Sequence, residues 1–171
     1  IGLTGQMHGM VALDKEGIVL RPCIMWNDQR SHLECSEISS KVGSKKVLGI
    51  TGNPILSGFT APKILWTQKN EPEIFAQIDK VLLPKDFIRY KLTGEFFSDV
   101  SDASGTSLLD VGKRTWSKEM LDALGWPISW MPEVTESTEP TSKISVEAAE
   151  LTGLLAGTPV VAGGGDCAAQ A

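Results

Sequence analysis

Three consecutive glycines followed by an aspartate form the segment best suited to chemistry. Gly163-Gly164-Gly165-Asp166 follows residues 158–162, which have the apolar pattern of a buried strand. Ligands of α/β proteins bind outside the carboxyl ends of strands, and glycines let a ligand approach the backbone closely. Asp166 is then the acid–base group of the turn. The run is not a Walker A motif, because no Lys-Ser/Thr pair follows, and it is not G-x-G-x-x-G, because residue 168 is Ala. A plain glycine turn with an aspartate helix cap is the alternative.

A second loop offers groups that could bind a hydroxylated ligand. Gln6-Met7-His8-Gly9 follows the apolar residues 1–5, which predict another buried strand. Its amide, thioether and imidazole can contact a sugar, and the imidazole can hydrogen-bond to hydroxyl groups. The alternative is an ordinary loop histidine. The other histidine, His32, falls in a predicted amphipathic helix and is expected to face solvent.

Two further segments carry polar groups that could bind a ligand. Trp26-Asn27-Asp28 combines an aromatic plate with two polar side chains, an arrangement that can hold a sugar or polyol, although Trp26 in the core and Asp28 as a helix cap would explain it equally. Residues 99–106 gather two carboxylates and three hydroxyls. They could bind an ion, or they could hydrogen-bond to their own backbone.

The elements that must position these loops follow from periodicity and capping signals. Strands are expected at both ends of the chain, and residues 10–13 and 18–20 predict a hairpin around Asp14-Lys15-Glu16-Gly17. Residues 133–142 form the best linker candidate. One helix is predicted to begin near Gln29, with Leu33 and Ile38 facing inward, and another to begin at Thr60 as N-cap, with Pro62 in its first turn. Further helices are predicted over residues 71–78 and over residues 84–92, where Gly94 follows. The last two are predicted over 118–124, between Ser117 and Gly125, and over 146–152, between Ser145 and Gly153. Strands enclosing helices predict an α/β protein.

Composition limits the possible partners. The 171 residues are 42% hydrophobic and 22% charged, which suits one domain or a large piece of a bigger one. A formal net charge of −5 gives no electrostatic attraction to nucleic acid or anionic lipid, and no apolar run approaches the roughly 18 to 20 residues of a membrane span. Three scattered cysteines lack the spacing of a zinc site and favour a reducing, cytoplasmic compartment. The chain begins with Ile1 and is expected to be a segment of a longer protein.

The motifs, taken in order, resemble the FGGY carbohydrate kinases from end to end. The segments that carry the resemblance are Gly5-Gln6-Met7-His8-Gly9, Leu20-Arg21-Pro22-Cys23-Ile24-Met25-Trp26-Asn27-Asp28, Thr51-Gly52-Asn53-Pro54, Gly58-Phe59-Thr60-Ala61-Pro62-Lys63, Leu82-Leu83-Pro84-Lys85-Asp86, Ser98-Asp99-Val100-Ser101-Asp102-Ala103-Ser104-Gly105-Thr106 and Val161-Ala162-Gly163-Gly164-Gly165-Asp166. The resemblance implies a ribonuclease-H-like, actin-like ATPase fold with two lobes. Residues 1–171 would be a partial N-terminal lobe that lacks the first strands with the phosphate loop and the C-terminal lobe.

The resemblance also implies roles for the residues named above. Asp166 would be the catalytic base that takes the proton of the sugar hydroxyl, and Met7 and His8 would bind a ketose. Gln6 and Trp26 are expected to line the same pocket. The implied reaction is ATP-dependent phosphorylation of D-xylulose to D-xylulose 5-phosphate. ATP and Mg²⁺ would be held mainly by missing parts, so the segment alone is expected to be inactive, with a homodimer as a further expectation.

Three alternatives remain open at this point. Related glycerol kinases carry an Arg-Glu pair where this chain has Met7-His8, which argues against glycerol but leaves other ketoses or polyols. A non-catalytic sugar-binding domain would keep this lobe and lose the ATP site. An unrelated nucleotide-binding α/β enzyme would rest on the triple glycine alone.

Overall fold

The computed structural model describes residues 1–171 and contains short strands and helices throughout. The strands are β1 (Thr4–Gly5), β2 (Val11–Leu13), β3 (Lys80–Leu82), β4 (Phe97–Asp99), β5 (Leu109–Asp110), β6 (Thr115–Trp116), β7 (Glu133–Thr135), β8 (Pro140–Lys143), β9 (Pro159–Val161) and β10 (Gly164–Gly165). The helices are α1 (His32–Val42), α2 (Ser44–Thr51), α3 (Thr60–Asn70), α4 (Pro72–Phe75), α5 (Pro84–Thr93), α6 (Val100–Ala103), α7 (Lys118–Leu124), α8 (Val146–Thr152) and α9 (Asp166–Ala169). Single 3-10 turns lie at Ser104–Thr106 and Ile128–Trp130.

The strands form two-stranded pairs of both kinds. β1 pairs in parallel with β10 and β4 with β7, whereas β2–β3, β5–β6 and β8–β9 are antiparallel. The expected α/β organisation is therefore confirmed. The pairing of β1 with β10 joins the first strand to the last, with Thr4 opposite Gly164 and Gly5 opposite Gly165.

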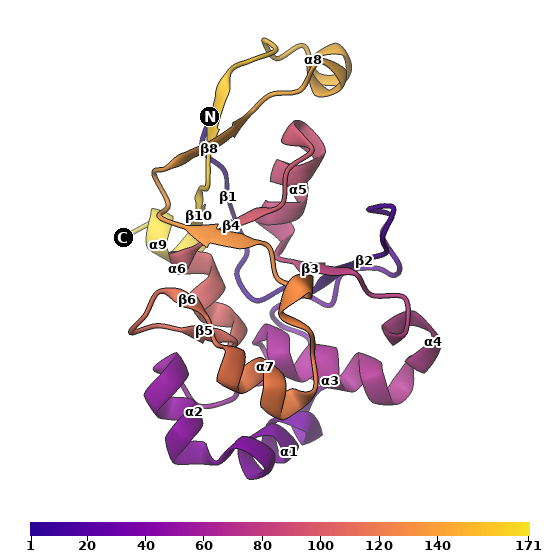
Figure 1. Ribbon diagram of the computed structural model, residues 1–171, viewed down its shortest axis with the longest axis vertical. Coiled ribbons are helices and arrows are strands. Elements are labelled where there is room, and N and C mark those ends of the chain that lie inside the picture. Colours follow the sequence, from indigo (N-terminus) through magenta and orange to yellow (C-terminus); the bar gives the residue numbers. More distant parts are fainter.

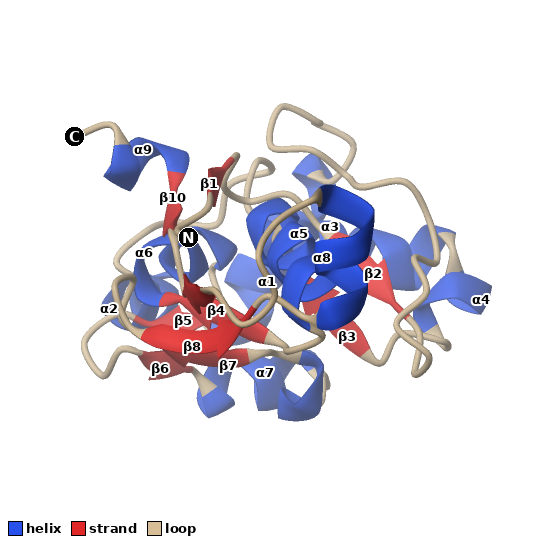
Figure 2. Ribbon diagram, turned by 90° about the horizontal axis from the view of Figure 1, so that it is seen from above, coloured by secondary structure: helices blue, strands red, loops and turns tan.

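The elements are distributed unevenly along the long axis of the molecule. Figure 1 shows α1, α2, α3 and α7 gathered at one end, α8 with β8 at the other, and β1, β10 and β4 between them. Seen from above in Figure 2, α9 and the C-terminus lie beside β1 and β10. No helix combines the length and the apolar character that crossing a membrane requires.

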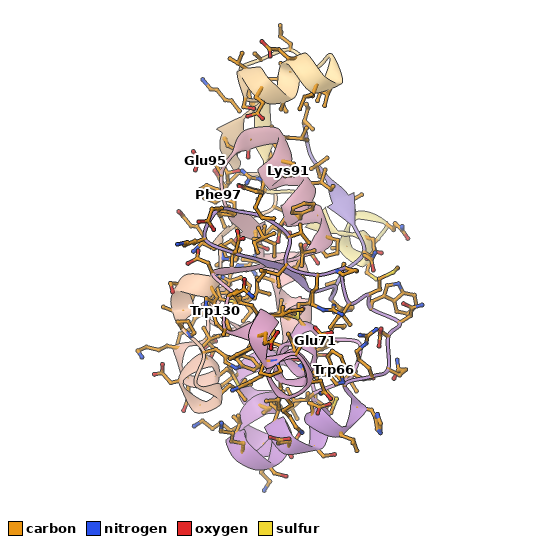
Figure 3. All side chains as sticks on the ribbon, turned by 90° about the vertical axis from the view of Figure 1, so that its right-hand side faces the viewer. Trp66, Glu71, Lys91, Glu95, Phe97 and Trp130 are labelled. Atoms are coloured by element: carbon orange, nitrogen blue, oxygen red, sulfur yellow. The ribbon has the colours of Figure 1, made fainter.

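The main core lies in the helical end. It contains 17 buried residues, among them Ile38 of α1, Ile64 of α3 and Leu121 of α7. Trp66 and Trp130 pack against its edge, and Figure 3 labels both in this half, away from Lys91 and Phe97 around α5. The core packs around α3, and the first turn of that helix contacts the predicted sugar loop.

Local capping signals predict several helix ends correctly. The Ser117 hydroxyl accepts a hydrogen bond from the amide of Met120, and the Ser145 hydroxyl accepts one from the amide of Ala148. Gly94 adopts the left-handed conformation that ends α5. Gly125 and Gly153 end α7 and α8 in the same conformation.

Other expectations about helices are wrong, and packing explains two of them. Ile38 is buried as predicted, but Leu33 is 66% exposed because α1 turns Glu34 inward in its place. Thr60 is not the N-cap of α3 but its first residue, and its hydroxyl donates to the carbonyl of His8. The helix predicted over residues 71–78 is reduced to the four residues of α4.

The predicted hairpin is present in a short form, and the predicted linker needs correction. Leu13 bridges Val19 and the Leu20 amide donates to the carbonyl of Ala12, but the strand that pairs with β2 along its length is β3. The stretch 133–142 is no linker, since it contains β7 and most of β8. Within this stretch, β7 pairs with β4 and β8 pairs with β9, so backbone hydrogen bonds hold the polar segment in the fold.

Candidate functional site

The β1–β10 pair brings the two sequence-predicted loops together. Both strands end at the same edge because they are parallel, so residues 6–9 and Asp166 leave the pair side by side. A Cβ atom on Gly165 would lie 2.8 Å from Cγ of Met7, which shows how closely the Met7 side chain packs on the backbone beside Asp166. The structure therefore confirms that these segments are neighbours.

The glycines before Asp166 serve contacts within the chain. Gly163 has φ of 87°, and a Cβ there would collide with the carbonyl of Leu3. Gly165 gives room to Met7. Gly163 and Gly165 thus allow β10 to approach β1 and the Met7 loop, and the approach of a ligand to this turn stays a prediction.

Asp166 begins α9 and stands at the end of this strand pair. The N-cap residue of α9 is Gly165, so Asp166 is not the cap that the alternative required. Its Oδ1 accepts the amide of Cys167 at 2.9 Å, and no lysine or arginine forms an ion pair with it. The half-buried carboxylate thus keeps lone pairs that can accept a proton.

His8 is held in one orientation from both sides of its ring. Its Nδ1 lies 2.7 Å from the carbonyl oxygen of Gly105, and its ring stacks on Phe59 with centroids 4.5 Å apart. A carbonyl only accepts hydrogen bonds, so Nδ1 carries the proton and Nε2 of the neutral ring is an acceptor. A Cβ on Gly105 would lie 2.5 Å from Nδ1, so only glycine fits there without displacing the ring.

Burial keeps the His8 ring neutral. It lowers the pKa of His8 below its usual value, and the nearby Lys63 ammonium acts in the same direction. The Gly105 carbonyl and the Asp166 carboxylate oppose these effects without reversing them. A neutral ring offers Nε2 as an acceptor for a hydroxyl group.

Gln6 and Trp26 occupy different surroundings from Met7 and His8. Gln6 lines a cavity of about 240 Å³ with Pro84 and Ile88, and its Oε1 is buried without a hydrogen-bond partner. Trp26 is 54% exposed, which rules out its placement in the core. The Asp28 carboxylate accepts hydrogen bonds from the backbone amide and from the guanidinium of Arg30. The proposed roles of Gln6 and Trp26 in a sugar pocket stay predictions.

A buried charge cluster lies behind the Asp166 turn. Nζ of Lys85 is 2.6 Å from Oδ1 of Asp86, 3.0 Å from Oδ1 of Asp99 and 2.9 Å from the carbonyl oxygen of Ala162, which precedes Gly163. The Asp99 carboxylate also accepts a hydrogen bond from the amide of Ser101. The Ser101 hydroxyl in turn accepts a hydrogen bond of 3.2 Å from the amide of Gly165. The cluster thus ties α5 and β4 to the turn that carries Asp166.

The aspartates in and beside this cluster differ in their pKa values. Burial alone would raise the pKa of Asp99, but the Lys85 ammonium and several hydrogen bonds outweigh it and hold that pKa below its usual value. Burial, followed by the repulsion of Asp86, raises the pKa of Asp102 to about 8, and neither oxygen of Asp102 has a hydrogen-bond partner. Asp102 is therefore protonated at neutral pH, and Asp99 carries the charge that balances Lys85.

Residues 99–106 do not form an ion-binding loop. Asp99 caps α6 by accepting the amides of Ser101 and Asp102, so the backbone alternative holds. No group of three or more His, Cys, Asp or Glu side chains in the chain is arranged to hold a metal ion.

Several residues around the site were not predicted as site residues. They are Phe59, Lys63, Lys85, Ser101 and Gly105, together with the contact of Thr60 to His8. One signal was available, because Lys63 interrupts an apolar helix between Ala61 and Ile64 and is completely buried. A lysine on a core-facing helix surface requires acceptors, and those acceptors belong to the site.

Comparisons with known proteins agree with this arrangement. Residues 1–171 match the N-terminal domain of the FGGY family of carbohydrate kinases. The chain is 53% identical to the xylulose kinase of Escherichia coli strain K12 over 171 residues, covering 100% of this chain and 35% of that protein. The xylulose kinase of Klebsiella pneumoniae is 48% identical with the same coverage. The chain thus spans about a third of the length of the curated relatives it matches.

Solved structures lead to the same family. A crystal structure of a xylulose kinase from Brucella ovis matches 99% of this chain and 34% of its own chain, with 49% identity and a TM-score of 0.92. A glycerol kinase from Plasmodium falciparum, solved with ADP, matches 98% of this chain and 34% of its own chain at 26% identity, with a TM-score of 0.87. These matches confirm the expected actin-like ATPase fold. The chain therefore belongs to the FGGY family of carbohydrate kinases and corresponds to the N-terminal domain of that family.

Proposed function

We propose that the complete protein containing this chain phosphorylates D-xylulose with ATP, giving D-xylulose 5-phosphate and ADP. The observation that supports this most is the β1–β10 register, which sets the Asp166 carboxylate beside the Met7–His8 loop. The names of the relatives support the choice of sugar, since those at 53% and 48% identity are xylulose kinases.

In the proposed reaction, Asp166 acts as the general base. Its carboxylate accepts the proton of the 5-hydroxyl while that oxygen bonds to the γ-phosphorus and the bond to the bridging oxygen of ADP breaks. Such transfer needs mainly correct positioning and charge stabilisation. His8 accepts a second sugar hydroxyl through Nε2, because Nδ1 already donates to Gly105.

ATP and Mg²⁺ are proposed to bind chiefly to parts of the protein outside residues 1–171. The matched proteins are about three times the length of this chain, which leaves a large part of each of them to bind ATP. A cytoplasmic location fits a reaction that uses ATP and the three free cysteines.

The principal competing function is a kinase for a related ketose or polyol. The match to a glycerol kinase shows that this fold carries enzymes named for different substrates, so fold alone does not select the sugar. A non-catalytic sugar-binding protein is the competitor from another class.

One assay separates these functions. ADP release by the complete protein is measured with D-xylulose, other ketoses and glycerol in turn, and the highest kcat/KM is expected for D-xylulose. A higher value for another compound would replace the proposed substrate, and binding without turnover would indicate a non-catalytic domain. Residues 1–171 alone are expected to release no ADP, and turnover by them would contradict the proposed division of the site.

Replacing His8 by alanine in the complete protein tests the sugar contact. Loss of the Nε2 acceptor is expected to cost about 1 to 3 kcal/mol in kcat/KM for D-xylulose, because a buried hydroxyl is left unpaired. KM for ATP is expected to stay unchanged. The measurement is steady-state kinetics with each substrate varied, and an unchanged kcat/KM for xylulose would return His8 to a purely structural role.

A further inference from the structure

The side chain of Lys63 is buried under the sugar loop without a carboxylate partner. Lys63 is 0% exposed, and its Nζ donates to the carbonyl oxygens of His8 at 3.2 Å, of Phe59 at 3.0 Å and of Gly58. The three N–H groups of an ammonium are thus matched by three backbone acceptors. No acidic side chain forms an ion pair with it, although exposed lysines elsewhere in the chain have such partners.

A lysine in this position is costly and would be replaceable if it only filled space. Burial lowers the pKa of Lys63 to about 8, which reflects the penalty for an ammonium removed from water. An apolar side chain of similar length would fill the same volume without that penalty. An apolar residue could not, however, donate hydrogen bonds to the carbonyl groups of His8, Gly58 and Phe59.

One of those carbonyl groups belongs to a backbone that needs support. His8 has φ of 71°, a left-handed conformation that is unfavourable for a residue with a Cβ. Its carbonyl oxygen accepts from Lys63 and also from the Thr60 hydroxyl at 3.1 Å. Both donors come from the first turn of α3, which the main core holds in place.

We infer that Lys63 and Thr60 are positioning residues that hold the His8 backbone in its left-handed conformation, so that Nε2 points to a sugar hydroxyl. This inference rests on the proposed sugar-binding role of His8. Neither residue touches the substrate, and each acts through the carbonyl oxygen of His8. The ring itself contacts the Gly105 carbonyl and the Phe59 ring, and Lys63 also donates to the carbonyl of Phe59.

The test uses Thr60→Val and Lys63→Met in the complete protein. Valine keeps the shape of threonine without its hydroxyl, and methionine keeps an unbranched chain without the ammonium. Thr67→Val is the matched control, because Thr67 is buried on the same helix and its hydroxyl donates to the Lys63 carbonyl at 2.9 Å rather than to the sugar loop. Thr60→Val is expected to raise KM for D-xylulose about 3- to 10-fold, and Lys63→Met about 10- to 100-fold. KM for ATP should not change in any of the three.

A double-mutant comparison distinguishes positioning from general destabilisation. In a His8→Ala background the effect of Thr60→Val on KM for xylulose should fall below about twofold, since the side chain that Thr60 positions is gone. An effect of equal size in both backgrounds, or one that Thr67→Val reproduces, would overturn the inference. If Lys63→Met does not fold, Thr60→Val carries the test alone. Failure of the wild-type protein to use D-xylulose would instead refute the proposed function.

Discussion

Replacing Asp166 by asparagine in the complete protein is expected to lower kcat by a factor of roughly 10² to 10⁴. Asparagine has the size and shape of aspartate but cannot accept the hydroxyl proton. Sugar binding should change little, because the Met7–His8 loop and its supports remain. The carboxylate has one hydrogen bond, to the Cys167 amide, and the asparagine oxygen can accept it as well.

Three measurements make this result decisive. They are kcat from ADP release, the affinity for xylulose by calorimetry, and the melting temperature. The matched control is Asp122→Asn, an exposed aspartate of α7 paired with Lys118, which should leave kcat unchanged. A folded Asp166→Asn variant that binds xylulose and turns over at the wild-type rate would show that another group takes the proton.

Replacing Lys85 by methionine is expected to reduce the free energy of unfolding by about 3 to 5 kcal/mol. The substitution removes the only ammonium from a cluster in which Asp86 and Asp99 are completely buried. The negative charge of Asp99 would then lack compensation, and Asp86 would lose its hydrogen-bond donor. The carbonyl of Ala162 would also lose its donor, so the turn before Asp166 should loosen as well.

Urea denaturation of the complete protein measures this loss. Lys118→Met is the control, since the Lys118 side chain is 76% exposed and its pairing with Asp122 should contribute little. Equal midpoints for the two variants would mean that the buried carboxylates are accommodated without Lys85. A lower midpoint for Lys85→Met alone, with reduced kcat, would connect the cluster to both stability and the position of Asp166.

The parts of the fold that could be predicted are those that depend on near neighbours in the sequence. Ser117 and Ser145 cap amides three residues away, and Gly94 ends α5 because its own backbone accepts a left-handed conformation. Leu33 was misplaced because the inward face of a short helix depends on what packs against it. Thr60 was misplaced because its partner, His8, is 52 residues away.

The candidate site divides in the same way. The Asp166 turn and the Met7–His8 loop could be recognised from strand-then-loop patterns and from family resemblance. The residues that support them could not, because Lys85 meets Asp99 and Lys63 meets His8 only through tertiary packing. A buried lysine can be suspected from an apolar run, but its acceptors cannot be named from spacing.

The parallel pairing of β1 with β10 has a consequence for protein synthesis. Thr4 and Gly164 lie 160 residues apart in the sequence, so this contact cannot form until residue 164 has been synthesised. The helical end around α1 and α3 can pack while the ribosome is still adding later residues. The Met7 loop, by contrast, lacks the glycine turn it packs on until residues 163–166 have left the ribosome. The residues of the main core, which extend to Met131, are therefore synthesised before the glycine turn on which the Met7 loop packs.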